Sequence, residues 1–81
     1  MSRLVLVTGA TGHLGANLVR ELLDRDHRVR VLVRMSSDLA PLLGLEVELV
    51  IGDLLDPLSV RRALHGVEIV FHAGLPQRAW T

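Results

Sequence analysis

The sequence predicts an α/β fold in which a doubly wound, parallel sheet carries helices on both faces. Short apolar runs alternate with segments of helical periodicity, and glycine, proline and aspartate stand at the borders between them. Strands separated by helices must run parallel and are joined by right-handed crossovers. We therefore expect the order β-α-β-α-β-α-β in a single unit.

The first strand and helix occupy the N-terminal part of the chain. Arg3 to Thr8 (RLVLVT) is apolar on both faces, which is typical of a central strand in a parallel sheet. A helix is expected from Gly12 onward, because apolar side chains recur there at helical spacing. These side chains are Leu14, Leu18, Val19, Leu22 and Leu23.

Two further strands follow, with a short helical turn between them. Arg28 to Arg34 (RVRVLVR) predicts the second strand, and Glu46 to Ile51 (EVELVI) predicts the third. Between them, Ser36 to Asp38 can cap a helical turn over Leu39 to Leu43, which Gly44 would end.

The last helix and strand have clear borders. Asp56 is an N-cap followed by proline in the first helical position, and Gly66 closes the helix. Val67 to His72 (VEIVFH) is the fourth strand. By analogy with the dinucleotide-binding half of doubly wound folds, we expect the strand order 3-2-1-4.

That order places the fourth strand at an edge of the sheet, although Ile69 to Phe71 are apolar on both faces. Such an edge normally has a neighbour, because its backbone groups are otherwise unpaired. We therefore expect residues 1–81 to be the N-terminal part of a larger domain. The alternative is that another chain covers this edge.

Composition excludes several classes of function. Nine basic and nine acidic residues give a formal net charge of zero, so nothing indicates a nucleic-acid or membrane partner. The absence of cysteine excludes disulfides and thiolate metal sites, and no histidine has a partner at metal-ligand spacing, so no metal is expected. The apolar run Leu4 to Val7 is too short for a signal peptide, which favours a cytoplasmic location.

The stretch VTGATGHLG, Val7 to Gly15, is the strongest functional signal. At a strand-to-helix turn, Gly9 allows a tight bend, Gly12 lets the backbone approach a ligand, and Gly15 lets the helix pack closely. The free N–H groups at the helix start favour a pyrophosphate. A purely structural turn is the alternative, and the missing Gly-Lys-Ser/Thr argues against a P-loop. The backbone of the intervening residues belongs to the same candidate site: Thr11, His13 and Leu14.

The glycine spacing in TGATGHLG resembles the short-chain dehydrogenase/reductase superfamily, and most closely its extended branch of epimerases, dehydratases and dihydroflavonol-reductase-like enzymes. VLVR at the end of the second strand, GDLLD after the third and VEIVFHAG at the fourth support this resemblance. It implies a Rossmann-type fold that binds NAD(P) and serves an oxidoreductase or epimerase, which transfers hydride between the nicotinamide and a carbonyl or alcohol carbon.

Arg34 favours NADP over the alternative cofactor, NAD. About twenty residues past the glycine motif, NAD-binding chains carry an acid that accepts hydrogen bonds from the ribose 2′-OH. Here an arginine occupies that position, and its guanidinium can bind a 2′-phosphate, with Ser36 or Ser37 as an added hydroxyl donor. The alternative interpretation is an exposed, charged strand end.

Two other strand ends enter the candidate site through the resemblance. It implies that Asp53 contacts the adenine amino group and that the Leu54 N–H assists, although Asp53 could instead be a turn carboxylate. It also implies that the loop His72-Ala73-Gly74 passes the cofactor ribose, although Gly74 departs from the family's usual His-x-Ala-Ala. His72 itself is better interpreted as a packed, hydrogen-bonded strand-end residue than as a catalytic proton-transfer group.

The chain contains no tyrosine and no lysine, so the Tyr-x-x-x-Lys pair of the resembled family is absent and no catalytic residue is assigned. Three interpretations follow: the cofactor-binding portion of an enzyme, a non-catalytic NmrA-like protein that senses the dinucleotide, or an inactive truncated stub. The expected partner is the dinucleotide. A small-molecule substrate is expected only if the chain continues, and a homodimer remains open.

Overall fold

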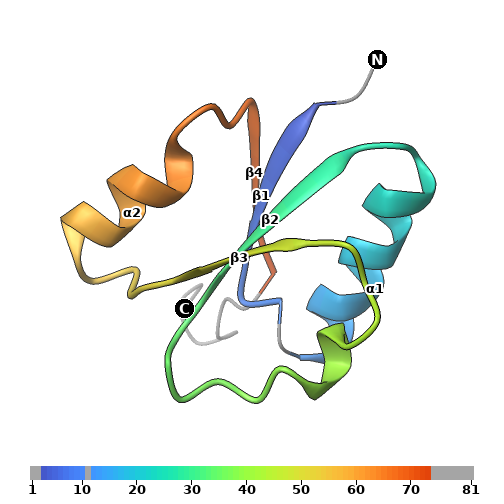
Figure 1. Ribbon diagram of the computed structural model, residues 1–81, viewed down its shortest axis with the longest axis horizontal. Coiled ribbons are helices and arrows are strands. Elements are labelled where there is room, and N and C mark those ends of the chain that lie inside the picture. The colour runs from blue at the N-terminus through green and yellow to red at the C-terminus, as the bar shows by residue number, and fades with distance from the viewer. Residues whose placement is uncertain (1–2, 11, 74–81) are drawn as a thin grey trace, which may run out of the picture.

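The computed structural model describes residues 3–10 and 12–73 (Figure 1). Within these ranges the chain alternates strands and helices, as the sequence predicts. The elements are β1 (Leu4–Thr8), α1 (His13–Asp24), β2 (Arg28–Val33), the 3₁₀ turn η1 (Ala40–Leu42), β3 (Glu48–Ile51), α2 (Pro57–Leu64) and β4 (Ile69–His72).

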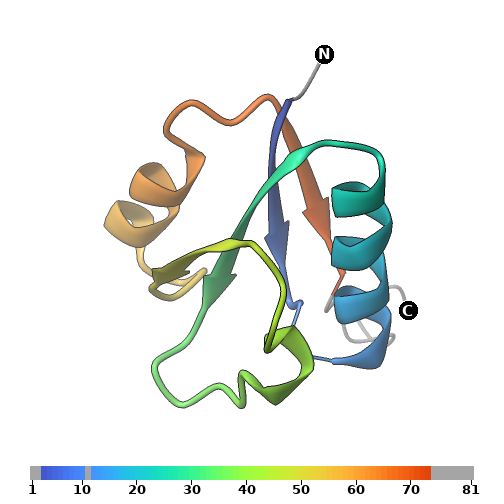
Figure 2. The ribbon, with the colours of Figure 1, turned by 45° about the vertical axis from the view of Figure 1, so that its right-hand side comes forward.

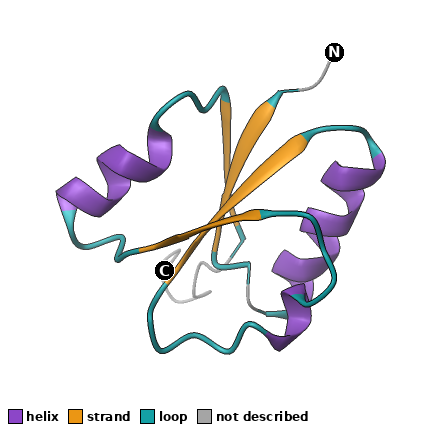
Figure 3. Cartoon of the chain, in the orientation of Figure 1, coloured by secondary structure: helices purple, strands orange, loops and turns teal. Residues whose placement is uncertain are grey.

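The four strands form one parallel sheet in the order β3-β2-β1-β4, which confirms the predicted fold class and strand order. In register, Val7 of β1 stands between Val31 of β2 and Phe71 of β4. The two α-helices lie on opposite sides of the sheet, as Figures 2 and 3 show. Because all strands run the same way, their carboxyl ends meet at one edge of the sheet.

Strand side chains alternate between the two faces and supply two apolar layers. On the α1 side, Val5, Val7 and Val31 are fully buried and pack with Val19 of the helix. On the α2 side, Leu6 and Leu32 pack against Ala63. Successive strand residues point to opposite faces, so the uninterrupted apolar run in β1 supplies both layers.

The connection between β2 and β3 contains the short helical turn that the sequence predicts over Leu39 to Leu43. It is the 3₁₀ turn η1 (Ala40–Leu42), with Pro41 near its start. It ends before Gly44, whose φ of 81° is easily adopted by glycine. Asp38 does act at this turn, since its Oδ1 accepts a hydrogen bond from the Ala40 N–H at 3.0 Å.

β3 and β4 each begin two residues later than predicted, at Glu48 and Ile69. The N–H groups of Val47 and Val67 are bonded locally rather than to a neighbouring strand, although the Glu68 N–H already donates to the Leu4 carbonyl of β1. The Val47 N–H donates to the Leu45 carbonyl, and the Val67 N–H donates to the Leu64 carbonyl at the end of α2. Apolar, β-branched residues at these positions look like strand in the sequence, but their N–H groups already have turn partners.

β4 lies at one edge of the sheet, as predicted, and β1 is its one partner among the described strands. Apolar side chains on both faces of β4 are partly open to solvent: Val70 is 49% exposed and Phe71 is 39% exposed. That a further segment or another chain covers this edge remains a prediction. None of the described helices is long and apolar enough to cross a membrane.

Candidate functional site

The carboxyl ends of all four strands surround a cavity of about 270 Å³. Ligands of open α/β sheets bind in this position, in the crevice where the strand order reverses, which here lies between β1 and β4. Ten residues from the strand ends and the loops after them line the cavity: Thr8, Gly9, Ala10, Leu32, Val33, Arg34, Ser37, Gly52, Leu54 and His72.

The turn between β1 and α1 needs its glycines for different reasons. Gly9 has a φ of 71°, a conformation that other residues rarely adopt. A Cβ on Gly15 would lie 2.5 Å from the Ala10 Cα and 2.6 Å from the Gly9 carbonyl oxygen, so only glycine lets the helix approach this closely. A Cβ on Gly12 would meet no atom within 4 Å, which leaves open space in front of the turn.

The N-terminus of α1 has free hydrogen-bonding capacity. Gly12 is its N-cap and has no side chain, none of the described side chains caps the helix, and the first turn carries no acidic residue. The first N–H groups of a helix have no partner within it, and the helix dipole adds a partial positive charge at this end. By contrast, α2 is capped by Asp56, whose side chain accepts from the Leu58 N–H at 3.1 Å. The start of α1 is therefore suited to an anion such as pyrophosphate.

Arg34 directly follows β2 and lines the cavity. Its backbone closes a turn with Ser37: the Arg34 carbonyl accepts from the Ser37 N–H at 3.0 Å, and the Ser37 hydroxyl accepts from the Arg34 N–H at 3.1 Å. Within residues 3–10 and 12–73, the Arg34 guanidinium forms no hydrogen bond or ion pair. Ser37 reaches the cavity wall, whereas Ser36 is exposed and does not line it.

At the end of β3, Leu54 and Gly52 line the cavity but Asp53 does not. The Asp53 Oδ1 accepts a hydrogen bond from the Leu55 N–H at 2.9 Å, so this carboxylate holds a turn, as the alternative interpretation of the sequence has it. Gly52 packs tightly, since a Cβ on it would lie 2.6 Å from the Ser59 Oγ. Contact between Asp53 and an adenine remains a prediction.

His72 ends β4 and contributes to the cavity wall. Its Nδ1 is hydrogen-bonded to the hydroxyl of Thr8, its register partner on β1. Sequence reasoning did not single out Thr8. The sequence did contain a signal for it: Thr8 is a polar residue at the end of an otherwise apolar central strand, immediately before the glycine turn.

The structure thus brings five of the predicted residues to one cavity: Gly9, Arg34, Ser37, Leu54 and His72. Six others do not line it: Gly12, Leu14, Gly15, Ser36, Asp53 and Ala73. Thr11 and Gly74 lie outside the described residues, and for His13 only the backbone is described.

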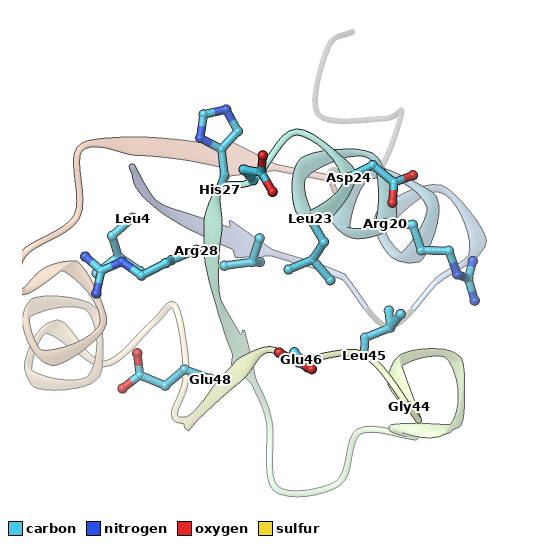
Figure 4. A pocket seen from close by; sticks show the side chains of 12 residues that line it. Leu4, Arg20, Leu23, Asp24, His27, Arg28, Gly44, Leu45, Glu46 and Glu48 are labelled. Carbon is cyan, nitrogen blue, oxygen red and sulfur yellow. The ribbon is translucent and has the colours of Figure 1, made fainter. Parts of the chain in front are cut away.

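A larger groove of about 800 Å³ opens at the opposite, amino-terminal edge of the sheet (Figure 4). It is a poor site for a diphosphate, because the negative end of the α1 dipole and four carboxylates surround it. Arg20 and Arg28 offset only part of that charge. The carboxylates belong to Asp24, Asp26, Glu46 and Glu48.

The side chains of the described ranges include no cluster of three or more histidine, aspartate or glutamate residues that could hold a metal ion. The geometry on the carboxyl side of the sheet has the parts of a nucleotide site: a glycine turn, a helix start that none of the described side chains caps, and an arginine at the next strand end. This combination defines a Rossmann-type dinucleotide-binding unit.

Comparison with known proteins agrees with this class. A family described as NAD(P)H-binding matches residues 9–79. Sterol demethylase protein B of Methylococcus capsulatus is 61% identical over 67 residues, which is 83% of this chain and 20% of that protein. A ceramide reductase of Caulobacter vibrioides is 47% identical over 72 residues, 88% of this chain and 23% of that protein.

Solved structures show the same fold. The crystal structure of gox2253 matches 99% of this chain and 24% of that chain, with a TM-score of 0.86 and 45% identity. A short-chain dehydrogenase/reductase superfamily protein from Agrobacterium tumefaciens, solved with bound NAD, matches 91% of this chain and 21% of its own, with a TM-score of 0.69 and 34% identity.

The chain therefore belongs to the NAD(P)H-binding family, and its structural neighbours include a short-chain dehydrogenase/reductase. It spans about a fifth to a quarter of the length of these relatives.

Proposed function

We propose that this chain binds NADP(H) across the carboxyl edge of its sheet, as the cofactor-binding portion of an oxidoreductase or epimerase. In this proposal the complete protein transfers hydride between the nicotinamide and a carbonyl or alcohol carbon of a small molecule. The family match and the reductase among the relatives support the reaction class.

The dinucleotide would cross the sheet from β2 and β3 toward β4. Its pyrophosphate would lie at the start of α1, where the N–H groups and the space in front of Gly12 admit an anion. The adenosine half would extend toward Leu54 and Arg34, and the loop after β4 would follow the other half. In these assignments the dinucleotide occupies the cavity and also contacts the backbone of the two segments next to it, the start of α1 and the loop after β4.

The observation that carries the choice of NADP is Arg34. Arg34 is exposed and lines the same cavity as the glycine turn, and its guanidinium has no partner among the described residues. A 2′-phosphate can take two parallel hydrogen bonds from a guanidinium, and the adjacent Ser37 hydroxyl lies in the same turn. A ribose 2′-OH offers the guanidinium no comparable charge.

The test is the ratio of the dissociation constants of NADP⁺ and NAD⁺, measured by calorimetry on the natural protein and on Arg34→Ala. A charged hydrogen bond is worth about 1.5–3 kcal/mol, so NADP⁺ binding should weaken by about 10- to 150-fold in the variant. NAD⁺ binding should change by less than about threefold.

Arg28→Ala is the matched control, since Arg28 is an exposed arginine at the opposite end of the same strand. It should leave both constants near those of the natural protein. Equal affinity for the two dinucleotides in the natural protein, or unchanged NADP⁺ affinity in Arg34→Ala, would refute the proposed preference.

The 81 residues contain neither tyrosine nor lysine, so a Tyr-x-x-x-Lys pair is not among them. The role proposed for these residues is to hold and orient the dinucleotide.

A further inference from the structure

The hydrogen bond between Thr8 and His72 joins two strand ends in the wall of the cavity. A second bond lies beside it, because the Thr8 carbonyl accepts from the Ala73 N–H at 2.9 Å. The end of β4 is thereby fastened to the residue that precedes Gly9. Whatever binds at the glycine turn therefore lies next to a histidine whose ring is held in place.

The surroundings of Thr8 determine which partner donates the proton. Thr8 is only 3% exposed, and among the described residues its hydroxyl has no hydrogen-bond partner other than His72. If His72 Nδ1 carried a proton, the Thr8 oxygen would accept it, and the hydroxyl proton would then be buried without an acceptor. A buried donor without a partner costs about 1–3 kcal/mol. The hydroxyl therefore donates, and Nδ1 accepts.

We infer that Thr8 selects the tautomer of the neutral His72 ring that carries its proton at Nε2, and that this N–H donates a hydrogen bond to an oxygen of the bound dinucleotide. The hydrogen bond at one ring nitrogen sets which nitrogen carries the proton. His72 is exposed, and its Nε2 has no partner within residues 3–10 and 12–73. The inference rests on the proposed function for its ligand and makes Thr8 a positioning residue.

The choice of ring form matters because the oxygens of a diphosphate and a ribose are rich in lone pairs. An Nε2–H is a donor that these oxygens can accept from, whereas a bare Nε2 would place another lone pair against them. Thr8 thus converts a strand-end histidine into a donor without any change in its charge.

The first test needs no ligand and no folding-sensitive variant. Nitrogen NMR of the protein, expressed as its gene encodes it, distinguishes a protonated from a bare ring nitrogen above the pH at which imidazole carries two protons. The signals of His72 are assigned by their loss in His72→Gln. We expect Nδ1 to be bare and Nε2 protonated. A protonated Nδ1 would overturn the inference.

Two variants of Thr8 separate the hydroxyl from the packing. Thr8→Val keeps the shape and removes the donor, so Nδ1 should become partly protonated. Thr8→Ser keeps the hydroxyl and should retain the natural ring form. Ser59→Ala is the matched control, because it removes another buried hydroxyl, one bonded to Asp56 rather than to His72. A change in the His72 ring form in Ser59→Ala would show a general effect and contradict the inference.

The second test adds NADP⁺. The Nε2 proton resonance should move downfield on binding, and Thr8→Val should bind about 2- to 12-fold more weakly, which corresponds to one neutral hydrogen bond. Thr8→Ser should restore most of the loss. If the natural protein binds neither dinucleotide, the proposed function is refuted. The tautomer of His72 is still tested in that case, because it is measured without ligand. If NADP⁺ binds and neither the resonance nor the Thr8→Val affinity changes, the donor role is refuted.

Discussion

Substituting Gly15 by alanine should destabilise the fold and the site together. The added Cβ would lie within 2.9 Å of three backbone atoms, namely the Ala10 Cα, the Ala10 carbonyl carbon and the Gly9 carbonyl oxygen. Backbone cannot rotate away as a flexible side chain can, so either α1 or the turn must move.

The magnitude follows from two opposing effects. Forcing extra volume into a packed site costs about 1–3 kcal/mol, and the rigid neighbours place this case at the upper end. Alanine is better than glycine in a helix by about 1 kcal/mol, which offsets part of that cost. We therefore expect the free energy of unfolding to fall by about 2 kcal/mol, and dinucleotide affinity to fall with it because the turn is displaced.

Gly12→Ala is the matched control, because it makes the same chemical change three residues earlier in open space. As an N-cap, alanine is less favourable than glycine, so stability should fall by no more than about 1 kcal/mol. Its Cβ would nevertheless project where the pyrophosphate is proposed to lie, and it should weaken binding strongly.

Urea denaturation gives the stabilities, and calorimetric titration with NADP⁺ gives the affinities. The expected pattern is that Gly15→Ala loses both, whereas Gly12→Ala loses mainly affinity. A Gly15→Ala protein as stable as the natural one would refute the packing argument. A Gly12→Ala protein that binds NADP⁺ normally would refute the placement of the ligand.

Three other substitutions test the scaffold by urea denaturation. Arg30 is 11% exposed and donates to the carbonyls of Ala63 and His65 at the end of α2, so Arg30→Ala should cost about 2–3 kcal/mol and an unchanged midpoint would contradict this. Asp56→Ala removes the cap of α2 and should lower the free energy of unfolding by about 1 kcal/mol. An unchanged free energy of unfolding would contradict the capping role. Asp26 has a φ of 64°, so Asp26→Gly should raise stability by up to about 1 kcal/mol, and a decrease would argue against strain at this turn.

The strand order could be predicted because two independent features of the sequence indicate it. The apolar run in β1 requires a central position, and the glycine turn is typical of the first crossover in a doubly wound sheet. Borders were harder to predict. Val47 and Val67 have strand-forming side chains, but their N–H groups are bonded to preceding turns, and that depends on local backbone geometry rather than residue type.

In the candidate site, too, some residues could be predicted from the sequence and others depend on the local geometry of the fold. Gly9 and Arg34 were predictable because their positions relative to a strand end carry a physical meaning. Ser37, rather than Ser36, lines the cavity because the turn after β2 folds its hydroxyl back onto the Arg34 N–H. Thr8 could not be assigned from the sequence, since its role arises from the register that sets it opposite His72.

The most direct test of the whole account is a map of backbone amide NMR shifts during titration with NADP⁺. The account predicts that the largest changes fall on the glycine turn from Gly9 to Gly15 and on Arg34, at the carboxyl edge of the sheet. The account would be contradicted if the largest changes fell instead on Leu23 and Leu45, which line the groove at the opposite edge of the sheet.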